Sequence, residues 1–429
     1  EEFDCRDGFL FNEDGTKIAF WQIDANQVRD FLMINNTDSI YSFNIPVEYP
    51  KVGEFPSPAK IGVIDLTNEN KITWMKIPGP ANNNYLPRMM WAPSSDELYV
   101  QQLNRKQNHS KIFIANASSG SVKLLREEKD DAWVDIRNSW PNNDQAGWKF
   151  INDGTNFLYV TEKDGWSHIY NFNVETKKEY LVTNGEYDVI KPLGIDEKNG
   201  IIYFIASPEN ATQRFLYKTN INGNGSLKKV TPNTLKGSNS YQISPNGNYA
   251  FHRFSNYFTK PMNQLISLPN HKSMKNEKSI SEKFDPKLKR NSALSFFQIT
   301  TVDDVTMDGW IVKPKNMDPK KKYPVLFYFY SEPAGTTVLD RYGVGNNRLY
   351  NGDMQEDGYV YVSFDGRGTP SPKGRGWRKA IYRGIGKVNV RDMGMGALEV
   401  FKKYEFIDTS RVAVHGWSGG GSATLNCLF

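Results

Sequence analysis

The sequence predicts two domains of different fold class, a partial β-propeller followed by an α/β domain. Three observations carry this prediction: a turn that recurs at a regular interval, a polar segment in the middle of the chain, and alternating strand and helix patterns after it. The 429 residues are too many for one hydrophobic core, since single cores stop growing at roughly 250–300 residues. We therefore divide the chain into a propeller at 1–270, a Lys- and Ser-rich linker at 271–290, and the α/β domain at 291–429.

The recurring turn is an Asp-Gly, Asn-Gly or related pair followed by a short apolar segment rich in aromatic residues. Such pairs close β-hairpins, because glycine and asparagine tolerate the left-handed backbone of the turn. The turns lie at Asp14-Gly15, Ser95-Asp96, Asp153-Gly154, Asn199-Gly200 and Asn246-Gly247. The last three are 46 and 47 residues apart, a spacing typical of propeller blades. An irregular β-sandwich is the alternative, and a Pro- and Gly-rich stretch at 49–58 indicates an inserted loop in the first repeat.

The region 291–429 alternates between strand and helix patterns, as a parallel sheet with crossover helices requires. Nearly continuous apolar runs at 323–330 and 359–364 are typical of central, buried strands. Apolar residues at helical spacing predict a helix over 390–404, and a short strand follows at 411–415.

Charge and composition argue against several classes of function. The 53 Lys and Arg residues exceed the 48 Asp and Glu residues only slightly and are spread along the chain, so neither nucleic acid nor an anionic membrane is indicated. No apolar run approaches the ~18 residues needed to span a bilayer. The five histidines lack metal-ligand spacing, and the two cysteines, Cys5 and Cys427, lie near opposite ends. We expect no metal, no cofactor and no disulfide framework.

A Gly-x-Ser-x-Gly motif at Gly416-Trp417-Ser418-Gly419-Gly420 follows the last predicted strand directly. The motif matches a nucleophile elbow, a strained turn from strand to helix that exposes the serine hydroxyl. Ser418 is therefore the candidate nucleophile. The backbone N–H of Gly419, at the start of the following helix, is a candidate donor to an oxyanion. A simple glycine-rich loop is the alternative interpretation.

Taken in series, the motifs resemble the prolyl oligopeptidase family of serine peptidases, and within it the dipeptidyl peptidase IV group. The motifs are Lys322-Tyr323-Pro324, Tyr330-Ser331-Glu332-Pro333, Phe364-Asp365-Gly366-Arg367-Gly368 and Gly416-Trp417-Ser418. The resemblance covers nearly the whole chain. It implies that 291–429 is the N-terminal part of an α/β-hydrolase catalytic domain, and that the Tyr330 hydroxyl binds the oxyanion beside the Gly419 N–H.

The first two residues, Glu1 and Glu2, resemble the acidic pair with which dipeptidyl peptidases hold the free α-ammonium of a peptide. Two carboxylates suit this role because charge-assisted hydrogen bonds recognise an ammonium group strongly. The resemblance implies release of N-terminal dipeptides, peptide substrates with a free N-terminus, and a homodimer of the complete protein. It also implies a periplasmic, secreted or membrane-anchored location. An exposed acidic terminus is the alternative.

The sequence departs from the family in three places. Glu332 replaces the small residue that usually follows the tyrosine segment, and Gly419 replaces an aromatic residue that walls the pocket before the scissile bond. No histidine follows Ser418 in the chain, and His415 is too close in sequence to be its base. Both ends indicate a piece of a longer protein. We expect the triad Asp and His to lie beyond it, and the chain alone to be inactive.

Three other functions stay open at this point. An endopeptidase or an acylaminoacyl peptidase of the same family would keep Ser418 but would not need the Glu pair. A non-catalytic binding protein on the same scaffold would need neither. A nucleic-acid binder is suggested only by two short basic, glycine-rich stretches, at 366–368 and 373–377, which are more often solvated loops.

Overall fold

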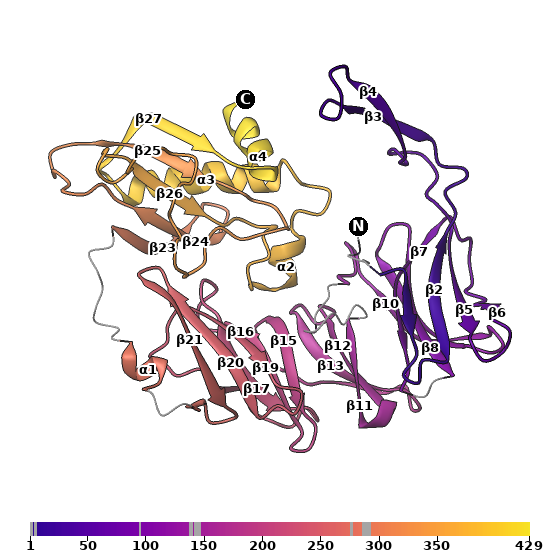
Figure 1. Cartoon of the computed structure of the whole chain (residues 1–429). Helices are drawn as coiled ribbons and strands as arrows, with labels where there is room; N and C mark the ends of the chain where they lie inside the picture. The colour runs from indigo at the N-terminus through magenta and orange to yellow at the C-terminus, as the bar shows by residue number, and fades with distance from the viewer. Residues whose placement is uncertain are drawn as a thin grey trace. The chain divides into compact units, whose positions relative to one another are not determined.

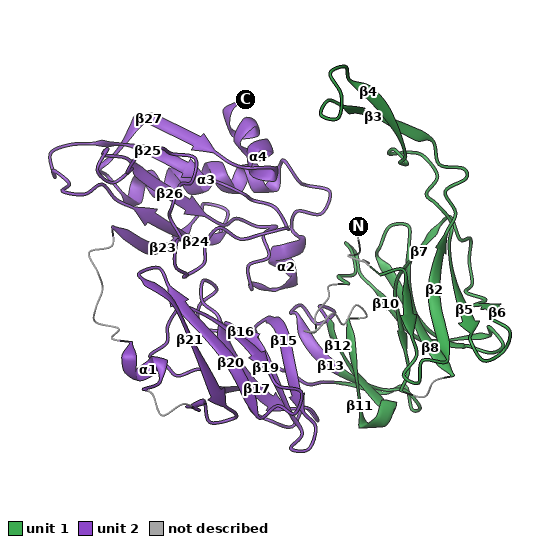
Figure 2. Ribbon diagram, viewed as in Figure 1, with its two compact units in different colours: residues 1–160, 171–180 green, residues 161–170, 181–429 purple. Residues whose placement is uncertain are grey.

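The computed structural model describes residues 3, 7–93, 96–136, 140, 147–274, 278–284 and 293–429 (Figure 1). Two compact units make up the chain (Figure 2). Unit 1 contains residues 1–160 and 171–180, and unit 2 contains residues 161–170 and 181–429. The division into domains at 1–270, 271–290 and 291–429 stays a prediction.

Five four-stranded sheets follow one another along the first part of the chain, and in each the first strand pairs antiparallel with the second. The first two sheets are formed by β1 (Phe9–Phe11), β2 (Lys17–Ile23), β5 (Ala59–Asp65) and β6 (Lys71–Trp74), and by β7 (Asn84–Trp91), β8 (Glu97–Asn104), β9 (His109–Asn116) and β10 (Val122–Lys129). The third contains β11 (Trp148–Ile151), β12 (Asn156–Thr161), β13 (His168–Asn173) and β14 (Glu179–Leu181), with the single turn η1 (Asn152–Gly154) between its first two strands.

The fourth and fifth sheets belong to unit 2. They consist of β15 (Val189–Asp196), β16 (Ile201–Ala206), β17 (Phe215–Asn220) and β18 (Lys228–Lys229), and of β19 (Ser238–Ile243), β20 (Tyr249–Asn256), β21 (Thr259–Ser267) and β22 (Lys272–Ser273). A shared apolar cluster packs these two sheets together, with Leu193, Tyr203, Leu216, Tyr241 and Ile266 among its members. Repeated four-stranded sheets packed in this way are propeller blades, so the predicted partial β-propeller is confirmed.

The recurring glycine turns occupy the same place in four of the five described blades, between the first and second strands. Gly15, Gly154, Gly200 and Gly247 all have left-handed backbones, with φ of 72°, 87°, 63° and 70°. L-residues with a side chain adopt this conformation only at a cost, which explains why the turn repeats a glycine. The Ser95-Asp96 pair, which lacks the glycine, falls in the corresponding connection of the second blade, between β7 and β8. Ser95 itself lies outside the described residues.

The insertion in the first repeat is larger than the predicted loop at 49–58. A separate antiparallel hairpin, β3 (Asp30–Asn35) and β4 (Phe43–Glu48), precedes that loop between β2 and β5. Its apolar side chains are exposed; Leu32, Met33 and Ile34 keep 57%, 52% and 66% of their surface accessible. A surface patch of this kind is typical of an interaction site.

The α/β part is built on a five-stranded sheet in the order β23 (Leu294–Thr300), β24 (Thr306–Val312), β26 (Val360–Phe364), β25 (Tyr323–Tyr328) and β27 (Ile407–His415). The strands β26, β25 and β27 run parallel, whereas β23 and β24 add an antiparallel edge. The helices are α1 (Ile280–Lys283), α2 (Gly374–Lys379), α3 (Val388–Lys403) and α4 (Gly419–Leu428). Met393 and Val400 of α3 pack with Phe327 and Phe364 in the core. The predicted α/β-hydrolase type of domain is confirmed.

The turn glycines offer a matched test of the blade geometry. At Gly247 a Cβ atom would lie 2.7 Å from the Cβ of Asp196, whereas at Gly200 it would meet only a side-chain atom of Ile221 at 3.9 Å. Gly247→Ala should therefore lower the free energy of unfolding by about 2–4 kcal/mol, from backbone strain plus overpacking. Gly200→Ala should lower it by about 1–2 kcal/mol, from backbone strain alone. Denaturant titrations measure both, and equal losses would contradict the proposed close packing at Gly247.

Candidate active site

The Gly-x-Ser-x-Gly motif forms a sharp turn between β27 and α4. Strand β27 ends at His415, helix α4 begins at Gly419, and Ser418 stands between them with φ 54° and ψ −118°. This conformation is strained for a residue with a side chain, and strain of this kind concentrates at active sites. Ser418 is exposed and its hydroxyl does not cap the helix. The turn has the form of a nucleophile elbow.

The glycines of the elbow are required by contacts with backbone atoms. A Cβ on Gly416 would overlap the carbonyl oxygen of Gly420, and a Cβ on Gly420 would overlap the carbonyl oxygen of Phe329. Backbone atoms cannot move aside as the end of a flexible side chain can. The two glycines therefore let the turn pack directly against the end of β25.

The start of α4 presents an N–H group beside Ser418. The N–H groups of Gly420, Gly421 and Ser422 donate within the turn, to Trp417 O at 2.9 Å and to Ser418 O at 2.9 and 3.2 Å. In the described part of the chain, the Gly419 N–H has no such acceptor. A free N–H at a helix N-terminus is suited to bind a developing negative charge.

Tyr330 lies next to the elbow because β25 and β27 are parallel neighbours in register, with Tyr328 opposite His415. The Phe329 N–H donates to the carbonyl of His415 at 3.1 Å. A Cβ on Gly420 would lie 3.1 Å from the Cα of Tyr330. The structure thus brings the segments of Tyr330, Ser418 and Gly419 together.

The loop after Tyr330 is held in place from α3. Ser331 has a left-handed backbone, with φ 57°, and is almost fully buried. The side-chain amide of the buried Asn389 donates to the Ser331 carbonyl at 3.2 Å. Tyr330 itself is half-buried, and the backbone that follows it is anchored.

His415 contacts Tyr361 rather than the Ser418 hydroxyl. Its Nε2 lies 3.2 Å from the Tyr361 hydroxyl, and its ring stacks on Tyr361 with an interplanar angle of 16°. Burial lowers the pKa of His415 below its ordinary value. This places the imidazole in an aromatic layer beneath the elbow, where its neutral form is favoured.

A pocket of about 680 Å³ opens beside Tyr330 and Trp417. Two exposed arginines, Arg341 and Arg348, line it together with Tyr328. The sequence analysis missed both arginines, because neither belongs to a recognisable motif. Their charge makes this side of Tyr330 positive.

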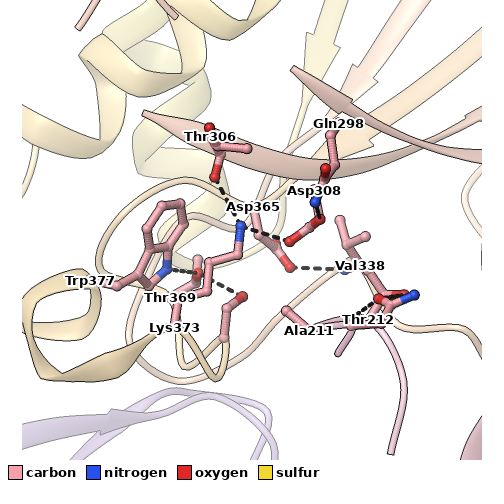
Figure 3. Close-up of polar contacts among 12 residues, drawn as sticks. Ala211, Thr212, Gln298, Thr306, Asp308, Val338, Asp365, Thr369, Lys373 and Trp377 are labelled. Carbon is pink, nitrogen blue, oxygen red and sulfur yellow. Dashed lines mark hydrogen bonds and ion pairs between the residues drawn. The ribbon is translucent and has the colours of Figure 1, made fainter. Parts of the chain in front are cut away.

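Asp365, which follows β26, fixes a second loop near the site (Figure 3). Its buried carboxylate accepts hydrogen bonds from the N–H and hydroxyl of Thr337, both at 2.9 Å, and from the N–H of Val338 at 3.0 Å. Burial raises the pKa of Asp365 despite these donors. The family motif at 364–368 therefore has a structural role, to hold the loop that leads away from Tyr330.

The two basic, glycine-rich stretches are occupied by internal ion pairs. Arg367 donates from Nη2 to the buried Asp392 at 2.7 Å. Lys373 lies 2.7 Å from Asp308 and 2.9 Å from the carbonyl of Thr306, as Figure 3 shows. Because Arg367 and Lys373 already pair with carboxylates of the same chain, they are not available to bind phosphate groups. This weighs against the nucleic-acid alternative.

Helix α2 is anchored by a buried ionic cluster within unit 2. Arg378 donates to Asp188 at 2.6 and 2.9 Å and from Nε to Glu162 at 2.6 Å. Lys379 adds a second contact to Glu162 at 3.1 Å. Arg378 is only 5% exposed, so each charge in the cluster depends on its partners.

Two further predicted residues, Glu1 and Glu2, lie outside the described residues, as does Cys5. Within the described ranges, no helix is long and apolar enough to cross a membrane. Over the same residues, no group of three His, Cys, Asp or Glu side chains is arranged to hold a metal ion.

Two segments of the chain match known protein families. Residues 352–429 match the prolyl oligopeptidase family. Residues 1–261, more than half of the chain, match the dipeptidyl peptidase IV (DPP IV) N-terminal region. The chain therefore belongs to the dipeptidyl peptidase IV family, and the resemblance inferred from its motifs is confirmed.

Individual relatives agree with this assignment. "Probable dipeptidyl-aminopeptidase B" of Aspergillus terreus is 28% identical over 398 residues, which cover 89% of this chain and 42% of that protein. Dipeptidyl peptidase 4 of Trichophyton equinum is 26% identical, over 100% of this chain and 55% of the relative. The crystal structure of Porphyromonas gingivalis dipeptidyl peptidase 4 matches with a TM-score of 0.85 and 28% identity, over 100% of this chain and 58% of that one. The chain thus spans about half the length of the relatives it matches.

The elbow contacts predict unequal effects of two adjacent alanine substitutions in the complete protein. Gly420→Ala places a methyl group on the Phe329 carbonyl, so it should displace the turn and slow fluorophosphonate labelling of Ser418 at least about 100-fold. Gly421→Ala meets nothing closer than 3.5 Å and should leave labelling unchanged, with up to about 1 kcal/mol gained from helix propensity. Equal labelling of the two variants would refute the proposed backbone contact.

Proposed function

We propose that the complete protein is a serine exopeptidase that releases N-terminal dipeptides through an acyl-enzyme. The observation that carries the proposal is the strained backbone of Ser418 at the start of α4, beside a free Gly419 N–H among the described residues. Membership of the dipeptidyl peptidase IV family supports the choice of substrate. The substrates are peptides with a free N-terminus.

The chemistry follows from the positions of these groups. A general base takes the proton of Ser418, and the Ser418 oxygen attacks the carbonyl carbon of the scissile bond. The oxygen of that carbonyl becomes negative and is bound by the Gly419 N–H and the Tyr330 hydroxyl. The leaving amine receives the proton, and water then hydrolyses the ester to free the dipeptide and restore Ser418.

The base and its orienting acid come from elsewhere in the complete protein. No histidine follows Ser418 in this sequence, and His415 is engaged by Tyr361. In α/β-hydrolases the acid and the histidine come after the serine in chain order. The relatives are about twice as long as this chain, which leaves room for both residues.

Glu1 and Glu2 hold the substrate's α-ammonium in this proposal and so set the cut after the second residue. This distinguishes the proposed exopeptidase from an endopeptidase or an acylaminoacyl peptidase, which would not need them. A non-catalytic binding protein has no need of the strain at Ser418. The complete protein acts outside the cytoplasm, as a periplasmic, secreted or membrane-anchored enzyme.

The role of the Glu pair is tested with dipeptide 4-nitroanilides that have a free or an acetylated N-terminus. In the complete protein, Glu2→Gln should raise KM for the free-amine substrates about 10- to 100-fold, because it removes one charge-assisted contact to the ammonium. The acetylated substrates should be poor and little affected. If the wild type cleaves both kinds equally well, the enzyme is an endopeptidase or acylaminoacyl peptidase instead.

We also propose that the complete protein is a homodimer and that the exposed β3–β4 hairpin contributes to its interface. Ile34→Asp should then shift the complete protein from dimer to monomer in sedimentation velocity, since it places a charge in an apolar contact. Phe251→Asp, at a residue 64% exposed on β20, is the control and should leave the dimer intact. A monomeric wild type would exclude the proposal.

A further inference from the structure

Two residues that depart from the family pattern, Glu332 and Gly419, occupy one space. A Cβ placed on Gly419 would overlap three atoms of the Glu332 carboxylate group, Cδ, Oε1 and Oε2. The carboxylate therefore lies against the Cα of the residue that follows the nucleophile. The space in which the replaced aromatic residue would start at position 419 is thus filled by a charged group.

The backbone that carries this carboxylate is constrained on both sides. Ser331, just before it, has a left-handed backbone and is anchored by Asn389. On the other side, Glu332 forms an isolated bridge with Gly335. A backbone constrained on both sides fixes where the Glu332 side chain starts, as the position of a specificity residue requires.

No counter-charge for the Glu332 carboxylate is found among the residues that the structure describes. It makes no hydrogen bond or ion pair there, although the side chain is partly buried. The pocket arginines Arg341 and Arg348 line a cavity whose lining does not include Glu332. The Glu332 oxygens are not among the buried side-chain oxygens that lack a partner, so they stay open to solvent. A substrate that covers them would remove their water and leave the charge unpaired unless it brings a cation.

We propose that Glu332 is a specificity-determining residue that binds the positively charged side chain of the residue immediately before the scissile bond. This proposal rests on the proposed function. The carbonyl oxygen that binds the Gly419 N–H belongs to this substrate residue. Its side chain is therefore the substrate group that starts closest to the carboxylate packed on Gly419.

The charge of Glu332 also acts on the transition state. A neutral substrate leaves the carboxylate beside a developing oxyanion, and the two negative charges repel each other. A Lys or Arg side chain neutralises the carboxylate, and the repulsion is removed when the oxyanion forms. The preference for basic substrates should therefore appear in kcat as well as in KM.

The test compares Gly-Lys and Gly-norleucine 4-nitroanilides, both with free N-termini, in the complete protein. Their side chains have the same carbon chain and differ by the ammonium group. We expect kcat/KM to favour lysine by about 10-fold or more in the wild type, as charged hydrogen bonds typically do. The ratio should fall to near one in Glu332→Gln, which keeps the shape of the side chain but not its charge.

Glu356→Gln is the matched control, since it removes a carboxylate that already pairs with Lys315. It should keep the wild-type preference for lysine. A preference that survives in Glu332→Gln would overturn the proposal. So would an equal loss for both substrates that disappears when their N-termini are acetylated, because the carboxylate would then bind the α-ammonium.

A thermal double-mutant cycle tests the contact without relying on catalysis. Gly419→Ala displaces only the flexible end of the Glu332 side chain, so it should lower the Tm of the wild type slightly, by about 1 °C, and should have no such effect when Glu332→Gly has already emptied the space. Additive effects would show that the side chains do not share this space. If the wild type cleaves no dipeptide substrate, the proposed function fails and the specificity role with it, whereas the cycle still reports the contact.

Discussion

The contact between the backbone of the elbow and the carbonyl of Phe329 is the constraint on which the candidate site depends. Because no side chain separates Gly420 from the end of β25, the strand that carries Tyr330 lies directly beside the turn that carries Ser418. The same contact brings the Gly419 N–H and the segment of Tyr330 to the same side of the site, next to Ser418. The strain at Ser418 persists because backbone atoms on both sides leave the turn no room to relax.

Helix α3 extends this constraint to the surrounding loops. Asn389 holds the carbonyl of Ser331, and one helical turn further Asp392 holds Arg367 of the loop after β26. Asp365 in turn fixes the N–H groups of Thr337 and Val338. These three loops are thus tied to buried polar groups of the α/β core, and such pairing favours one arrangement over its alternatives.

The features that the sequence predicted are those in which the local backbone demands a particular residue. Gly154, Gly200 and Gly247 mark blade turns because the turn itself is left-handed, and the elbow glycines mark the nucleophile for a similar reason. The strands β23 and β24 and the hairpin β3–β4 escaped prediction because their pairing is decided by tertiary contacts rather than by turn residues. The contact between Glu332 and Gly419 joins segments that are distant in sequence. The sequence therefore showed that each residue differs from the family pattern, but not that the two residues touch. Glu1 and Glu2 lie outside the described residues, and their role stays a prediction.

The shared space of Glu332 and Gly419 also restricts how this site can evolve. While the Glu332 side chain keeps this conformation, any side chain at 419 meets its carboxylate, so a residue larger than glycine there requires the end of Glu332 to move. A large residue at 419 and a small residue at 332 are therefore expected to occur together, because only one of the two side chains can occupy the space.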